Sequence, residues 1–216
     1  MLADRRAFTL AEVVLGLAVL SLVGLSVAGL SVALSNAYAD GEEFQRSLQT
    51  SRSTMLKLQS TIRKARLITG QNGNDLLLWT EDGNENGGIN LTEVKMLRWE
   101  PSSGEIREFR IVIPESLSPA LREAFNFPIG LNTLVTNPGM IASMLSSHVW
   151  SEERVLAGGV SGLALTGEPS IPTSRMLKMN ITAGSVPREA SLRSVVKLRA
   201  DATGCVKQQD GTWVLD

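Results

Sequence analysis

The chain has 216 residues and a formal net charge of −1, so it is long enough for one globular domain and an appendage. The balanced charge gives no electrostatic reason to expect a nucleic-acid-binding protein. One cysteine excludes an internal disulfide bond and a cysteine-based zinc cluster, and one histidine leaves few of the usual hydrolase schemes. We therefore do not expect an enzyme.

An uncharged, strongly apolar segment occupies residues 13–39. As a helix it would span roughly 40 Å, more than the ~30 Å hydrocarbon core of a bilayer. A secretory signal has a shorter apolar region, of about 7–15 residues, so this segment predicts a membrane-spanning helix. Arg5 and Arg6 precede the segment, and three carboxylates follow it, which by the positive-inside rule keeps the amino terminus cytoplasmic and exports the remainder: Asp40, Glu42 and Glu43.

One carboxylate, Glu12, lies at the start of this apolar helix. A carboxylate in hydrocarbon costs about 2.5–3.5 kcal/mol on insertion scales and usually has a partner. No basic residue follows Glu12 within two helical turns, and Arg5 precedes it by about two turns. A plain membrane anchor has no use for Glu12. Cleavage between Ala7 and Phe8, however, would free an α-ammonium group close to this carboxylate.

The sequence Arg5-Arg6-Ala7 followed by Phe8-Thr9-Leu10-Ala11-Glu12 resembles the class III signal of type IV prepilins and pseudopilins. The resemblance implies that a prepilin peptidase cuts before Phe8 and methylates the new amine. It also implies that Glu12 neutralises the amine of a neighbouring subunit during assembly. The family strongly prefers Gly before the cut, and this chain departs from that preference with Ala7.

Apolar residues recur at roughly helical spacing after the membrane segment, which predicts that the helix continues to about Ile68 and stops at Gly70. A long amino-terminal helix docked on an antiparallel sheet is a pilin-like, α+β fold. The expected organisation is a leader at 1–7, a transmembrane half of the helix at 8–39, a periplasmic half at 40–68 and a globular β domain at 69–216.

Short strand-like segments follow the helix. Two short helices are expected in an insertion at about 116–150, because Ser118-Pro119 and Asn137-Pro138 each place a capping residue before a proline. A final strand pair is expected to turn at Asp210-Gly211. The other predicted strands show alternating or continuous apolar residues: 76–79, 94–100, 107–113, 160–166, 177–181 and 192–198.

The segments RVLAGGVSGLALTG, MLKMNIT and SLRSVVKLRA are similar to the tail of J-type minor pseudopilins and of W-type minor pilins. The similarity implies a non-enzymatic subunit of the type II secretion pseudopilus tip, in the bacterial inner membrane with its globular domain in the periplasm. It also implies two kinds of partner, the prepilin peptidase and other pseudopilins. The alternatives are a minor pilin of a type IV pilus, and a singly anchored periplasmic domain, calcium-binding or enzymatic, outside any filament.

The sequence DGNENGGINLTE, residues 82–93, matches the EF-hand loop pattern D-x-[DN]-x-[DN]-G-x5-E at every position, with Gly87 at the sharp turn. Only two of the predicted ligands are charged, which suits a weak Ca²⁺ site of roughly 10⁻⁴–10⁻³ M. The flanks read as strands, whereas EF-hand loops join helices, so a polar hairpin loop is the alternative. The predicted oxygen ligands follow the spacing of the pattern: Asp82, Asn84, Asn86, the Gly88 carbonyl, Asn90 and Glu93.

Overall fold

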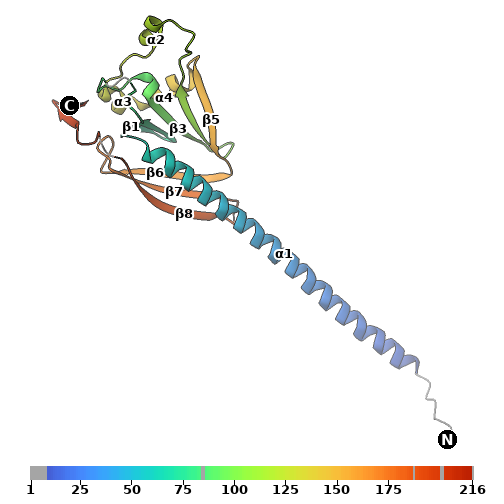
Figure 1. The fold of residues 1–216 in the computed structure, drawn as a ribbon. Coiled ribbons are helices and arrows are strands. Elements are labelled where there is room, and N and C mark those ends of the chain that lie inside the picture. The colour runs from blue at the N-terminus through green and yellow to red at the C-terminus, as the bar shows by residue number, and fades with distance from the viewer. Residues whose placement is uncertain (1–8, 84–85, 187, 200–201, 216) are drawn as a thin grey trace. The chain divides into compact units, whose positions relative to one another are not determined.

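A computed structural model describes residues 9–83, 86–186, 188–199 and 202–215 (Figure 1). These residues form an α+β protein, in which a long amino-terminal helix precedes antiparallel sheets, as the sequence predicts. The chain divides into two compact units, Met1–Gln45 and Arg46–Asp216.

Helix α1 occupies Leu10–Arg63 and is long and apolar enough to cross a membrane. It ends before the predicted Ile68, because residues Leu67–Asn72 form strand β1 instead. The backbone N–H of Arg66 donates to the carbonyl oxygen of Trp79 at 2.7 Å, which begins the strand pairing. Leu67 and Ile68 then bury their side chains in two different apolar clusters, as successive strand residues do.

The first sheet is five-stranded and antiparallel, in the order β1-β2-β3-β4-β5. Cross-strand partners Asp75 and Arg98 are joined by two hydrogen bonds, at 2.7 and 2.9 Å, which raise the pKa of the Arg98 guanidinium. Strand β3 follows a short 3-10 helix, η1 (Leu91–Glu93). The remaining strands of this sheet are β2 (Asp75–Trp79), β3 (Val94–Glu100), β4 (Glu105–Ile111) and β5 (Ser151–Ala157).

Three short helices lie between β4 and β5, one more than predicted: α2 (Pro119–Phe125), α3 (Leu131–Thr136) and α4 (Pro138–Ser147). Helix α3 was missed because Gly130 precedes it, with no side-chain cap. Ser118 caps α2, because its side chain accepts a hydrogen bond from the Leu121 backbone N–H at 3.4 Å. Asn137 precedes α4 without a side-chain cap bond.

The second sheet has three antiparallel strands: β6 (Val160–Glu168), β7 (Met176–Ala183) and β8 (Ala190–Lys197). Figure 1 shows these strands side by side along the carboxyl-terminal part of α1. A separate hairpin of β9 (Val206–Gln209) and β10 (Thr212–Leu215) turns at Asp210-Gly211, as predicted.

The core of the globular unit lies on both faces of the five-stranded sheet. On one face, Leu58 and Ile62 of α1 pack with Leu76 of β2 and Ile181 of β7, so helix and second sheet share one apolar cluster. On the other face, leucines of α3 and α4 cover Trp79 and its neighbours. The first sheet is therefore buried on both sides, which explains why β2 reads as a continuous apolar run.

Candidate functional site

The amino-terminal site is built around Glu12 in the first turn of α1. Its Oε2 accepts a hydrogen bond from the backbone N–H of Thr9 at 2.9 Å and another from the Thr9 hydroxyl at 3.0 Å. The Glu12 backbone N–H donates to the Thr9 hydroxyl at 3.3 Å, which completes a capping box. Both donors to the carboxylate are neutral, so they orient Glu12 without neutralising its charge. Ala7 and Phe8 lie outside the described residues, and the cleavage site between them stays a prediction.

The helix beyond Glu12 presents an uncovered apolar surface. In its most apolar window of 18 residues, no residue is buried within the described chain. A methyl group added at Gly16, Gly24 or Gly29 would meet no atom within 4 Å. Small residues on a membrane helix allow another helix to approach closely, so this surface suits lipid or a second helix.

The serines of the same segment satisfy their own hydroxyls. Ser21, Ser26 and Ser31 each donate to the carbonyl oxygen four residues earlier, at 2.8–2.9 Å. A hydroxyl bonded inside its own helix needs no water partner, which removes most of the cost of placing it in hydrocarbon. These three serines are therefore compatible with a membrane.

The first carboxylate of the predicted calcium loop, Asp82, is hydrogen-bonded to the backbone of the loop itself. Asp82 accepts hydrogen bonds from the backbone N–H groups of Asn86, at 3.1 Å, and Gly87, at 3.0 Å. Gly87 has a φ of 71°, a left-handed conformation that favours glycine, as the pattern requires. Arg66 also approaches Asp82, with 3.6 Å between nitrogen and oxygen. The charge of Asp82 is thus partly balanced within the protein.

The last predicted ligand, Glu93, is buried and already fully hydrogen-bonded. Its Oε1 accepts from the Gly83 backbone N–H at 2.8 Å, and its Oε2 accepts from the Asn90 backbone N–H at 3.1 Å and from Trp79 Nε1 at 3.3 Å. Glu93 is only 3% exposed. Its carboxylate therefore ties both ends of the loop to the sheet, a role that the loop pattern does not indicate.

The structure brings Asp82, Asn86 and Gly88 together, because the Gly88 backbone N–H donates to Asn86 Oδ1 at 2.8 Å. Asn84 lies outside the described residues. Strands β2 and β3 flank the loop in place of the two helices of an EF-hand, and its last three residues form η1. Within the described ranges, no group of three His, Cys, Asp or Glu residues is arranged to hold a metal ion. Calcium binding stays a prediction, in which the ion would compete with hydrogen bonds already made.

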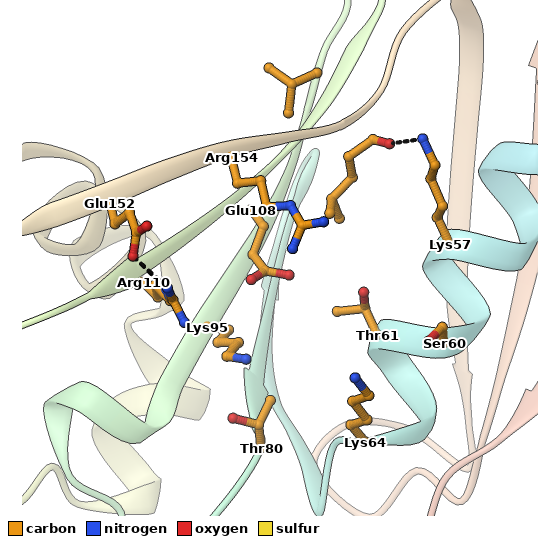
Figure 2. A pocket seen from close by; sticks show the side chains of 12 residues that line it. Lys57, Ser60, Thr61, Lys64, Thr80, Lys95, Glu108, Arg110, Glu152 and Arg154 are labelled. Atoms are coloured by element: carbon orange, nitrogen blue, oxygen red, sulfur yellow. Dashed lines mark hydrogen bonds and ion pairs between the residues drawn. The ribbon is translucent and has the colours of Figure 1, made fainter.

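One feature that sequence reasoning missed is a groove of about 370 Å³ between the carboxyl-terminal end of α1 and strands β3, β4 and β5. Figure 2 shows Lys57 and Lys64 on the helix side and Lys95 and Arg154 on the sheet side. We call it the cationic groove. The charged side chains that line it are five cations and two carboxylates: Lys57, Lys64, Lys95, Arg110 and Arg154, with Glu108 and Glu152.

No protein-family model matches the chain, and no curated protein is significantly similar to it. The long amino-terminal apolar helix and the antiparallel sheets are consistent with a pilin-like architecture.

Proposed function

We propose that the chain is a minor pseudopilin, an assembly subunit at the tip of a type II secretion pseudopilus. In this proposal a prepilin peptidase removes residues 1–7, the apolar helix anchors the subunit in the bacterial inner membrane, and the globular domain lies in the periplasm. The subunit then joins other pseudopilins and supports protein export.

One observation carries the proposal. Glu12 lies at the start of an uncovered apolar helix, and the described hydrogen-bond donors to its carboxylate are neutral. Placing an unneutralised carboxylate in hydrocarbon is costly, so a counter-charge from outside the helix is expected. A methylated amine at Phe8 of a neighbouring subunit would supply that charge.

A minor pilin of a type IV pilus is a second candidate, because the same helix, carboxylate and sheets serve both kinds of filament. Deleting the gene separates the two: loss of a secreted protein with pili retained supports the pseudopilin, and loss of pili supports the minor pilin. A singly anchored periplasmic domain would affect neither filament.

The substitution Glu12→Gln tests the proposal with little structural disturbance. Glutamine also serves in a capping box, so the substitution removes the charge and keeps the bonds to Thr9. Insertion should be retained or eased, because the desolvation cost of the carboxylate disappears. Crosslinking to other filament subunits in the native membrane should fall severalfold.

Two matched variants complete the experiment. Glu42→Gln removes a carboxylate that follows the apolar segment and should crosslink as the wild type does. Thr9→Val weakens the capping box but leaves the Glu12 charge, so it should retain most crosslinking. Two results would contradict the proposed role of Glu12: crosslinking of Glu12→Gln at the wild-type level, or a loss of crosslinking in Thr9→Val as large as in Glu12→Gln. In either case the carboxylate does not pair with the amine of a neighbouring subunit.

A further inference from the structure

The cationic groove concentrates one sign of charge in a chain that is nearly neutral overall. Its five cations exceed its two carboxylates by three, whereas the whole chain has a net charge of −1. Like charges gathered in one concave site repel one another and attract counter-ions from solution. Such a site favours an anionic ligand.

Two of the cations already have partners. Lys57 Nζ donates to the carbonyl oxygen of Leu156 at 2.8 Å, which fixes the helix against edge strand β5. Arg110 pairs with Glu152, with 2.6 Å between nitrogen and oxygen, and Figure 2 marks both interactions. These two cations therefore shape the groove rather than remain available to a ligand.

The side chains of the other three cations, Lys64, Lys95 and Arg154, make no hydrogen bond or ion pair with the described part of the chain, and Glu108 is the cross-strand neighbour of Arg154. The three cations come from the turn after α1, strand β3 and strand β5, and they line the same groove. Lys95 is half-buried, so part of its side chain is held against the wall of the groove. A carboxylate between these side chains would gain charge-assisted hydrogen bonds from opposite walls.

The shape of the groove favours a length of polypeptide over a single small ion. A second hollow, of about 440 Å³, shares Lys95 and Arg110 with the cationic groove and continues to Arg122 and Asn126 of the α2 region. Because the two hollows share these two lining residues, they lie next to each other, and an extended segment is long enough to reach both. The second hollow is also lined by Glu81 and Glu93. The hydroxyl group of Thr61 adds a neutral donor along the wall of the cationic groove.

We propose that the cationic groove binds an acidic segment of a protein partner, whose carboxylates lie among Lys64, Lys95 and Arg154. This goes beyond the proposed function and does not depend on it, because the groove belongs entirely to Arg46–Asp216 and requires neither cleavage nor filament assembly.

The test uses the full chain in a nonionic detergent and a fluorescein-labelled peptide of alternating Glu and Ser, with fluorescence anisotropy as the readout. The triple substitution Lys64→Gln, Lys95→Gln, Arg154→Gln should weaken peptide binding about tenfold, the loss expected for three partly exposed charge pairs. The matched control, Arg175→Gln, Arg193→Gln, Lys197→Gln, removes the same charge from exposed positions around the second sheet and should change the affinity less than about twofold.

Three results would overturn the proposal: equal losses in the two triple variants, equal binding of a peptide of alternating Gln and Ser, or citrate binding as tightly as the peptide. The last result would assign the groove to a small free polycarboxylate. The single substitutions Lys64→Gln and Arg154→Gln alter exposed side chains and keep the test valid if the triple variant does not fold. Each single substitution should weaken binding of the peptide about twofold or more.

Discussion

Helix α1 consists of two stretches whose apolar residues have different surroundings. From Leu10 to residue 45, no residue is buried within the described chain, although this stretch contains the most apolar window. From residue 46 to Arg63, a stripe of side chains is buried against both sheets. The second stretch serves the fold of its own domain, whereas the first has an apolar surface that its own unit leaves uncovered.

The buried stripe of the second stretch contains small polar residues as well as apolar ones. Ser47, Ser51 and Thr54 are buried in the second stretch beside the larger side chains Met55 and Ile62. Small residues allow the helix to approach the second sheet closely, and Ser51 Oγ donates to the carbonyl oxygen of Ala190 at 3.2 Å. Hydropathy alone therefore identifies the first stretch as apolar, but it understates how much of the second stretch is buried.

The largest expected effect comes from Ile62→Ala in the second stretch. Ile62 is 0% exposed, and removing such a core side chain costs about 2–5 kcal/mol of unfolding free energy, from lost burial and the cavity left behind. Leu22→Ala in the first stretch is the matched control, because Leu22 is 65% exposed. Denaturant unfolding of the full chain in detergent, followed by tryptophan fluorescence, gives both values. Similar losses in the two variants would remove the distinction between the stretches.

A smaller effect is expected from Gly184→Ala, which tests the close approach of helix and sheet. Gly184 has a φ of 97°, and a Cβ there would lie 2.4 Å from Ser47 Oγ and 2.8 Å from the Arg188 carbonyl oxygen. Backbone strain of this kind costs roughly 1–3 kcal/mol. Gly24→Ala is the control, because its Cβ would meet no atom within 4 Å. Unchanged stability of Gly184→Ala would show that the contact is looser than described.

Calcium is expected to have an effect of similar or smaller size, confined to the globular domain. With a site of about 10⁻⁴ M, millimolar calcium should stabilise the folded state by about 1.4 kcal/mol. Thermal melts of the full chain with calcium, with magnesium and with chelator provide the measurement. Asp82→Ala should abolish the calcium shift. A wild-type melting temperature that calcium does not move would leave residues 82–93 as a polar connection held by Glu93.

Much of the fold is readable from the sequence, because local signals specify it. The apolar run, the proline that follows Ser118, the strand at Val94–Glu100 and the turn at Asp210-Gly211 each depend on neighbouring residues. Strand β1 was less readable, because Leu67 and Ile68 also fit the helical period of the preceding segment.

Strand β5 and the cationic groove could not be read in the same way. Three successive exposed residues of β5 are charged, and two of them, Glu152 and Glu153, pair with Arg110 and Arg107 of β4, so the strand lacks a simple apolar pattern. The groove combines residues from α1, β3, β4 and β5, which only the tertiary fold brings together. The basic residues of α1 were visible in the sequence, but their partners across the groove were not.

The intact mass of the protein isolated from its native membrane decides whether the chain is a processed filament subunit. We expect a mature chain that begins at Phe8 and has one methyl group on its new amine, close to Glu12. A chain that still begins at Met1, or one cut within or after the apolar segment, would contradict it.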